Sequence, residues 1–174
     1  MCGIVGLYNT DSACDGGLLA AMRDLITHRG PDDGDSFLSG PLGLGHRRLS
    51  IIDLAGGHQP MLTADGRYAI VFNGEIYNYK ELQNDLRLAG VVFRTNSDTE
   101  VVLQLHAHLG DAAVSRLNGI FAYAIWDAHE RRLLLARDRA GIKPLYFCRS
   151  NRGIAFSSEI KSLFSSGLIS PGLN

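Results

Sequence analysis

The chain has 174 residues, of which 45% are hydrophobic and 20% charged, a composition typical of a globular protein rather than a disordered one. Its 17 basic and 18 acidic side chains are interspersed, so no basic tail indicates binding to nucleic acid or to an anionic membrane. No apolar stretch approaches the length of a membrane span, and no cationic leader precedes an apolar run at the start. We therefore expect one cytoplasmic domain that acts on a small, zwitterionic substrate.

The cysteines and histidines predict neither a disulfide framework nor a metal site. Cys2, Cys14 and Cys148 are odd in number and scattered, which favours a reducing compartment. His106 and His108 lie two residues apart on a predicted helix and therefore do not share a face. We expect both histidines to face solvent or the edge of the core.

The N-terminus carries a candidate nucleophile. Residues 4–8 predict a short apolar strand, which places Cys2 at its start. If Met1 is removed, Cys2 becomes the first residue, and a free α-amine, which titrates close to neutral pH, can accept the proton of the thiol. The alternative is that Cys2 is an ordinary buried residue, and only partners elsewhere in the chain can decide between the two.

A pair of arginines follows the first predicted helix. Apolar residues at helical spacing predict that helix over residues 18–26, and strand pieces at 43–46 and 49–53 then flank Arg47 and Arg48. The pair could lie on a solvated strand edge. Alternatively, one arginine points inward, where its planar guanidinium can bind a carboxylate with two parallel hydrogen bonds.

The next strand ends in a polar sequence. Residues 68–72 are rich in β-forming side chains and are followed by Asn73-Gly74, a strong hairpin signal when it stands alone. A helical pattern over residues 78–89, rather than a second strand, comes next. We therefore expect Asn73 and Gly74 to lie at the end of the strand, where functional groups are often presented.

A capped helix follows a predicted strand at residues 91–95. Ser97 and Glu100 have the spacing of a capping box, which predicts a helix that continues over residues 101–109. Asp98 lies in its first turn, where a negative charge complements the helix dipole. That explanation is sufficient, so a further role as the counter-charge of a substrate ammonium depends on its partners.

The C-terminal part predicts four strands and a short helix, at residues 120–126, 133–137, 145–148, 154–157 and 160–164. Short polar loops join the strands as antiparallel hairpins, and their apolar character indicates that both faces are covered. Residues 165–174 have the composition of a linker.

Eight blocks, in order over nearly the whole chain, carry a resemblance to a known family: Met1-Cys2-Gly3-Ile4, Arg29-Gly30-Pro31-Asp32, Gly45-His46-Arg47-Arg48-Leu49-Ser50-Ile51, Phe72-Asn73-Gly74-Glu75-Ile76-Tyr77-Asn78, Ser97-Asp98-Thr99-Glu100, Gly119-Ile120-Phe121-Ala122-Tyr123-Ala124-Ile125-Trp126-Asp127, Arg137-Asp138-Arg139 with Gly141-Ile142-Lys143-Pro144-Leu145-Tyr146, and Ser158-Glu159-Ile160-Lys161. Together they resemble the class II glutamine amidotransferase domain, and most of all the N-terminal glutaminase domain of glutamine-hydrolysing asparagine synthetases. The resemblance implies an α+β fold, the N-terminal nucleophile hydrolase four-layer αββα sandwich with two stacked antiparallel sheets. The domain would span residues 1–164, and residues 165–174 would begin a linker to a synthetase domain.

The resemblance also implies which residues catalyse the reaction. Cys2 would be the nucleophile, with its α-amine as the general base. Asn73, through its side-chain amide, and Gly74, through its backbone N–H, would form the oxyanion hole and contact the bound glutamine. An oxyanion develops when any amide is attacked, and one preorganised donor to it is worth about 3–4 kcal/mol.

Five further positions would bind L-glutamine by the same resemblance. Arg48 would hold its α-carboxylate, Asp98 its α-ammonium, and Glu75 would help to fix the same end. Backbone groups at Leu49 and Ile51 would line the pocket. Free glutamine carries opposite charges on one carbon, so a selective pocket needs an arginine and an acidic residue close together. The residues alone do not exclude that the two arginines exchange roles.

The implied reaction is hydrolysis of L-glutamine to L-glutamate and ammonia through a γ-glutamyl thioester on Cys2. The ammonia would serve an ATP-dependent amidation of aspartate in a C-terminal or separate synthetase domain. The pyrophosphate loop Ser-Gly-Gly-x-Asp-Ser of that domain does not occur here, so we expect no cofactor in this chain, with ATP and magnesium only in the missing domain. The chain would be a fragment, a short product or a subunit. The family more often has an aromatic residue where this chain has Ala140. This departure concerns local packing only.

Two alternatives remain at this point. The first is a class II amidotransferase domain that serves another acceptor, a phosphoribosyl compound, a hexosamine or a surface sugar. The second is a non-catalytic binding module, which becomes the better hypothesis if Met1 is retained, because the α-amine then belongs to the wrong residue.

Overall fold

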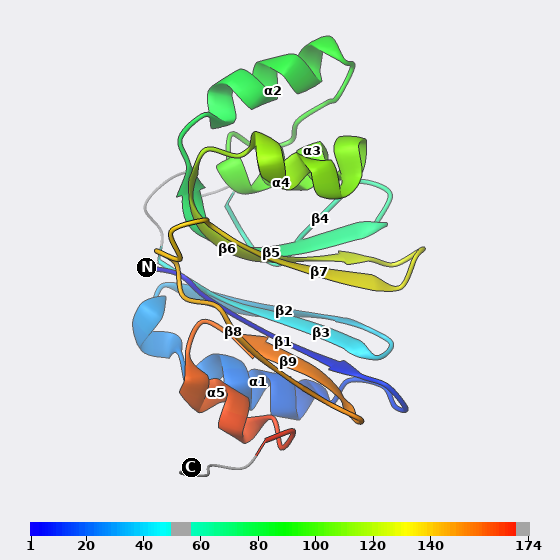
Figure 1. Ribbon diagram of the computed structural model, residues 1–174, viewed down its shortest axis with the longest axis vertical. Coiled ribbons are helices and arrows are strands. Elements are labelled where there is room, and N and C mark those ends of the chain that lie inside the picture. Colours follow the sequence, from blue (N-terminus) through cyan, green and yellow to red (C-terminus); the bar gives the residue numbers. More distant parts are fainter. Residues whose placement is uncertain (50–56, 170–174) are drawn as a thin grey trace. The chain divides into compact units, whose positions relative to one another are not determined.

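The structure, a computed structural model, describes residues 1–49 and 57–169 and forms two compact units (Figure 1). The first unit contains residues 1–49 and 144–169, and the second contains residues 57–143. Each unit has one antiparallel sheet. Ile51, one of the predicted pocket residues, lies outside the described residues.

The first unit is built on a five-stranded sheet with the order β2-β3-β1-β9-β8. Its strands are β1 (Gly3–Asn9), β2 (Asp33–Ser39), β3 (Leu42–Arg48), β8 (Tyr146–Ser150) and β9 (Gly153–Ser157), and its helices are α1 (Gly16–Asp24), the 3-10 turn η1 (Thr27–Arg29) and α5 (Ile160–Ser165). The predicted N-terminal strand lies at the centre of the sheet, antiparallel to β3 on one side and to β9 on the other. The first five residues of β1, residues 3–7, are buried.

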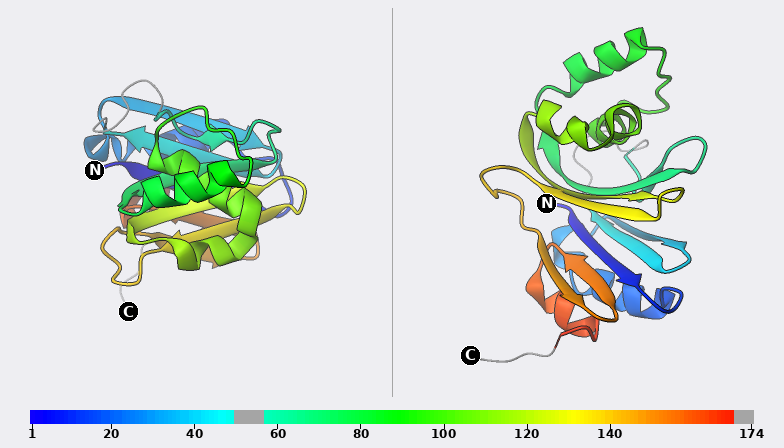
Figure 2. Two further views of the ribbon diagram at one scale, coloured as in Figure 1. Left: turned by 90° about the horizontal axis from the view of Figure 1, so that it is seen from above. Right: turned by 45° about the vertical axis from the view of Figure 1, so that its right-hand side comes forward.

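Helices α1 and α5 lie against the same face of this sheet, as Figures 1 and 2 show from different directions. Val5 and Leu7 of β1 point to that face and pack with Leu19 and Met22 of α1. Asp15 caps α1, because its carboxylate accepts the N–H groups of the first helical turn. Because successive side chains of a strand alternate, the residues of β1 next to Val5 and Leu7 point to the opposite face of the sheet.

The second unit is built on a four-stranded sheet with the order β4-β5-β6-β7. Its strands are β4 (Met61–Leu62), β5 (Tyr68–Ile76), β6 (Gly119–Asp127) and β7 (Arg132–Arg137), and its helices are α2 (Tyr79–Leu88), α3 (Asp98–Leu109), the 3-10 turn η2 (Gly110–Ala112) and α4 (Ala113–Arg116). Helix α3 lies between the sheet and α2 in both figures. This position explains why α3 is buried on most sides, including Glu100 and His106, which are 0% and 2% exposed. The expectation that His106 lies at the surface or the core edge is therefore wrong.

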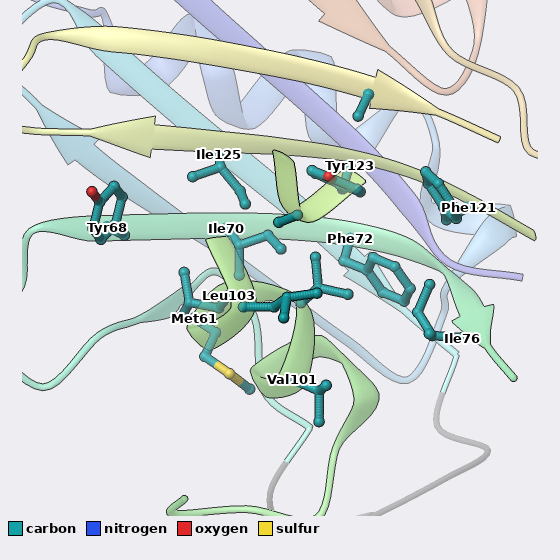
Figure 3. Close-up of a cluster of buried hydrophobic side chains, with 14 of the residues drawn as sticks. Met61, Tyr68, Ile70, Phe72, Ile76, Val101, Leu103, Phe121, Tyr123 and Ile125 are labelled. Atoms are coloured by element: carbon teal, nitrogen blue, oxygen red, sulfur yellow. The ribbon is translucent and has the colours of Figure 1, made fainter. Parts of the chain in front are cut away.

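The core of the second unit lies between its sheet and α3 (Figure 3). Ile70, Phe72 and Ile76 of β5 contribute alternate side chains to this cluster, and Val101 and Leu103 of α3 close it from the other side. Because alternate residues of a strand face opposite ways, the side chains between them on β5 point away from the helices.

Two sequence predictions about strands are corrected. Residues 91–95 form no strand; the carboxylate of Glu100 accepts the N–H groups of Arg94 and Thr95, so a side chain replaces a ladder partner. Strand β5 does not end before Asn73 but continues to Ile76, because β6 pairs with it along its whole length.

The two predicted C-terminal hairpins are confirmed, and they lie in different sheets. Strands β6 and β7 pair in the second unit, whereas β8 and β9 pair in the first. The strand piece predicted before the arginine pair extends through both arginines, while the piece at 49–53 falls mostly outside the described residues. Among residues 1–49 and 57–169, no helix combines the length and the apolar character that crossing a bilayer requires. The boundary at residue 164 stays a prediction.

Candidate functional site

The predicted site residues are divided between the two units. The first unit holds Cys2, Arg48 and Leu49, and the second holds Asn73, Gly74, Glu75 and Asp98. Each group is described within its own unit.

The backbone around Cys2 is held from several directions. Arg29 Nε donates to the Cys2 carbonyl oxygen at 3.0 Å. Ile4 and Ser158 exchange two hydrogen bonds, from the Ile4 N–H to Ser158 Oγ at 3.0 Å and from the Ser158 N–H to the Ile4 carbonyl at 2.8 Å. The Cys2 Sγ lies 3.8 Å from the carbonyl oxygen of Leu49. The thiol is therefore presented from a fixed strand end beside one of the predicted pocket residues.

The other two cysteines have surroundings that suit core packing. Burial, with a smaller contribution from the neighbouring Asp15 charge, raises the pKa of the Cys14 thiol to about 11. A thiol is a nucleophile only as the thiolate, so burial disfavours nucleophilic reaction at Cys14 near neutral pH. Cys148 packs against the apolar core of the first unit. Neither residue competes with Cys2 as the candidate nucleophile.

The two adjacent arginines of β3 point to opposite faces of the sheet. Arg47 lies on the face covered by α1, and its Nη2 donates to Asp24 Oδ1 at 2.5 Å. Arg48 lies on the other face and is 7% exposed. The guanidinium of Arg47 is thus engaged by a carboxylate of α1, whereas Arg48 faces away from that helix.

Asn73 presents a buried side-chain amide at the site. Its side chain is 2% exposed, and its Nδ2 has no hydrogen-bond partner among the described residues. Leaving a buried polar group unpaired costs about 1–3 kcal/mol, so such groups in folded proteins call for an explanation. An N–H reserved for a bound ligand is one. The next residue must be glycine, since a Cβ on Gly74 would lie 2.4 Å from the Ile120 carbonyl oxygen.

The edge of β5 that faces away from β6 carries a row of N–H groups. The Phe72 N–H donates to Gln59 Oε1 at 2.6 Å, and the Ile76 N–H donates to Asp98 Oδ2 at 3.0 Å. N–H groups of alternate residues in a strand point the same way, so the Gly74 N–H lies between these two and points to the same side. Side chains occupy the outer two donors, and the middle one belongs to a predicted oxyanion-hole residue.

A cavity of about 210 Å³ lies beside this edge within the second unit. Its described lining consists of Glu75, Ile76, Tyr77, Tyr79 and Asp98, so it combines two carboxylates with apolar and aromatic walls. None of these lining residues is basic. The cavity therefore suits a small cation such as an ammonium group.

The surroundings of Asp98 disfavour the ionised form of its carboxyl group. Burial raises the pKa of Asp98 above its ordinary value, and the negative charge of Glu75 raises it further. The N–H groups of Ile76 and Thr99 act in the opposite direction without cancelling the effect. A cation bound in the cavity would relieve both unfavourable contributions, which is the electrostatic signature of a binding residue.

Metal ligands do not gather anywhere in the part of the chain that the structure describes. Over residues 1–49 and 57–169, no three side chains of the histidine, cysteine, aspartate or glutamate type lie in a group that could hold a metal ion.

Comparison with known proteins decides the family. The model of the glutamine amidotransferase domain matches residues 1–174, which is the whole chain. The chain belongs to the glutamine amidotransferase domain family. This amidotransferase domain is 46% identical over 167 residues to asparagine synthetase [glutamine-hydrolyzing] 1 of Bacillus subtilis, and 43% identical over 169 residues to asparagine synthetase [glutamine-hydrolyzing] 2 of the same organism. The matches cover 94% and 95% of the chain but only 26% and 22% of these relatives.

A solved structure shares the fold of the amidotransferase domain. Glutamine phosphoribosylpyrophosphate amidotransferase from B. subtilis, complexed with ADP and GMP, superposes with a TM-score of 0.77 at 20% identity, over 98% of this chain and 46% of that one. This likeness, together with the two helix-covered antiparallel sheets, confirms the predicted α+β fold.

Sequence patterns predicted no role for two residues that support the amidotransferase site. Gln59 belonged to no predicted helix or strand, and Ser158 lay in a motif block with no role given to it. Their partners are 13 and 154 residues away in the chain, so no local spacing could have revealed these contacts.

Proposed function

We propose that this amidotransferase domain hydrolyses L-glutamine to L-glutamate and ammonia through a covalent thioester on Cys2. The observation that carries the proposal is the buried, unpaired side-chain amide of Asn73 beside Gly74. A buried amide without a protein partner costs stability, and binding of a ligand would offset that cost.

The first half-reaction forms the thioester. The α-amine of a mature N-terminal Cys2 takes the proton of its thiol, and Sγ attacks the side-chain amide carbon of glutamine. The tetrahedral oxyanion accepts hydrogen bonds from Asn73 Nδ2 and the Gly74 N–H. The C–N bond then breaks as the α-ammonium returns its proton to the departing nitrogen, and ammonia leaves.

The second half-reaction regenerates the thiol. Water attacks the γ-glutamyl thioester while the α-amine accepts its proton, and the same donors hold the new oxyanion. The C–S bond breaks and the amine returns the proton to sulfur. Glutamate is released, and no group outside the chain and the substrate is needed for the proton balance.

Charge provides substrate recognition in this proposal. Arg48 binds the α-carboxylate through its planar pair of donors, and Asp98 binds the α-ammonium with Glu75 adding negative charge nearby. Backbone groups at Leu49 and Ile51 complete the pocket. A substrate that lacks either charge would leave a buried charge unpaired and would bind poorly.

We further propose that the ammonia serves an ATP-dependent amidation of aspartate by a synthetase domain, which would hold ATP and magnesium, in the cytoplasm. The relatives at 46% and 43% identity are named as glutamine-hydrolysing asparagine synthetases, whereas the phosphoribosylpyrophosphate amidotransferase matches at only 20%. This difference supports aspartate over a phosphoribosyl acceptor.

The direct test is an assay of the purified chain, with its N-terminus verified as Cys2, on L-glutamine. We expect equal amounts of glutamate and ammonia, and no reaction with D-glutamine. A chain with this N-terminus that binds glutamine but releases neither product would support the non-catalytic module instead.

Replacing Asp98 by asparagine is expected to raise the KM for glutamine by about 10- to 150-fold, because a charge-assisted hydrogen bond is lost. The KM of the unsubstituted chain should rise as pH falls through the raised pKa of Asp98, and the variant should lack this acid limb. Steady-state kinetics across pH measure both effects. An equal KM in the two proteins at neutral pH would require another residue to bind the ammonium.

The same substitution is expected to stabilise the fold at pH 7. Because the folded-state pKa of Asp98 lies above its unfolded value, its ionised form destabilises the folded chain, and this penalty disappears as pH falls below about 4. Thermal melts should therefore show a higher Tm for Asp98→Asn at pH 7 and no difference at low pH. Asp85→Asn, an exposed change on α2, serves as the matched control and should leave KM unchanged.

A further inference from the structure

We infer that Gln59 is a positioning residue, whose side-chain amide ties the edge of β5 that carries Asn73 and Gly74 to the start of α3 that carries Asp98. The inference rests on the proposed function, since it concerns the donors and the counter-charge assigned there. Gln59 lies outside the sequence motifs of the resemblance and does not line the 210 Å³ cavity.

Both the oxygen and the nitrogen of the Gln59 side-chain amide form hydrogen bonds within the second unit. Its Oε1 accepts the Phe72 N–H at 2.6 Å, and its Nε2 donates to Thr99 Oγ1 at 3.3 Å. All three residues are buried, with exposures of 6%, 2% and 3%. In such surroundings a broken hydrogen bond is not replaced by water, so the two contacts fix the distance between strand and helix.

The register of the sheet explains why a side chain is needed at this point. Met61 pairs with Ile70 and Leu62 with Ala69, and β4 contains no other residues. Continuing the same register, position 59 faces Phe72. Gln59 therefore supplies through its side chain the acceptor that a longer β4 would have supplied through its backbone.

The second contact joins Gln59 to the helix that holds the counter-charge. Thr99 follows Asp98 directly, and its N–H donates to the Ser97 cap at 3.1 Å. Asp98 itself accepts the Ile76 N–H. Two neighbouring residues of α3 are thus linked to β5 at Phe72 and at Ile76, one of these links running through Gln59.

These two links enclose the proposed oxyanion donors. Asn73 and Gly74 lie between Phe72 and Ile76 on β5, so the two anchored N–H groups set the direction of the donor between them. A misplacement of about 1 Å at a reacting centre can lower a rate by about 100-fold. Loss of the Gln59 link would therefore affect donors and counter-charge together, although Gln59 touches neither.

The first test is Gln59→Met, which keeps the length of the side chain and removes its amide. We expect kcat/KM for glutamine to fall by about 100-fold, with a lower kcat and a higher KM. Gln59→Glu keeps an acceptor for the Phe72 N–H and lets the Thr99 hydroxyl donate, so it should recover part of the lost kcat.

The second test is Thr99→Val, which keeps the shape of the side chain and removes only the contact with α3. The Phe72 N–H remains bound, so we expect KM to rise while kcat changes less than in Gln59→Met. This variant also decides the case if Gln59→Met does not fold. Kinetic constants equal to those of the unsubstituted chain in a folded Thr99→Val would overturn the inference.

The matched control is Gln83→Met, which removes another buried glutamine amide, on α2, that does not line the 210 Å³ cavity. Unchanged kcat and KM are expected there. If Gln59→Met behaves in the same way, Gln59 is a structural residue only and the inference fails while the proposed function stands. If the unsubstituted chain with Cys2 as its N-terminus does not hydrolyse glutamine, the proposed function fails first.

Discussion

Replacing Cys2 by alanine is expected to lower the rate of glutamine hydrolysis by about 10⁴-fold or more, because no other group can form the thioester. Binding should survive, since the proposed contacts to the α-carboxylate and α-ammonium come from Arg48 and Asp98. A glutamate-release assay and a binding titration on the same preparation separate the two effects.

The matched controls for this variant are the remaining cysteines. Cys14→Ala and Cys148→Ala should keep full activity, since one thiol is held protonated by burial and the other packs in the core. Retained hydrolysis in the Cys2→Ala chain, or its loss in both control variants, would remove Cys2 from the role of nucleophile.

Replacing Asn73 by alanine is expected to lower kcat by about 10²- to 10³-fold while KM changes little, because its donor stabilises the oxyanion rather than the bound substrate. The substitution should not lower the Tm. Asn73 Nδ2 has no partner to lose among the described residues, and removing a buried unpaired amide removes an unfavourable contribution.

A combined fall in kcat and gain or constancy in Tm distinguishes a functional donor from a structural one. Asn84→Ala, an exposed change on α2, should alter neither quantity. If Asn73→Ala unfolds the chain or leaves kcat unchanged, the oxyanion must be bound by other groups.

The helices and most strands follow from local pattern. The apolar spacing of α1 and α3 and the β-rich runs of β5 and β6 are strong signals, and the structure contains all four elements. The predicted strand over 91–95 is wrong because Glu100 supplies the hydrogen bonds of that segment, and a fully buried glutamate in a helix has no distinct sequence signature.

The predicted capping box forms only in part, for a related reason. Ser97 caps α3 by accepting the Thr99 N–H, as predicted, but its own N–H donates to Thr95 Oγ1 rather than to Glu100. The spacing predicted the cap residue correctly. It could not show that the carboxylate of Glu100 binds N–H groups of the preceding loop instead.

In the candidate site, too, local sequence patterns predicted some features, whereas contacts between residues far apart in the chain could not be predicted. The sequence left open which arginine of the pair points inward, and the structure shows that Arg47 contacts Asp24, 23 residues away, on the face covered by α1. Gln59 was unpredictable, since its role depends on the register of a two-residue strand and on a helix 40 residues further on.

The most direct test of the central claim is mass spectrometry of the chain trapped by rapid acid quenching during turnover of L-glutamine. We predict that the N-terminal peptide begins at Cys2, without Met1, and carries on the sulfur of Cys2 the mass of glutamine less ammonia. An active chain that retains Met1, or whose adduct lies on a different residue, would contradict the account.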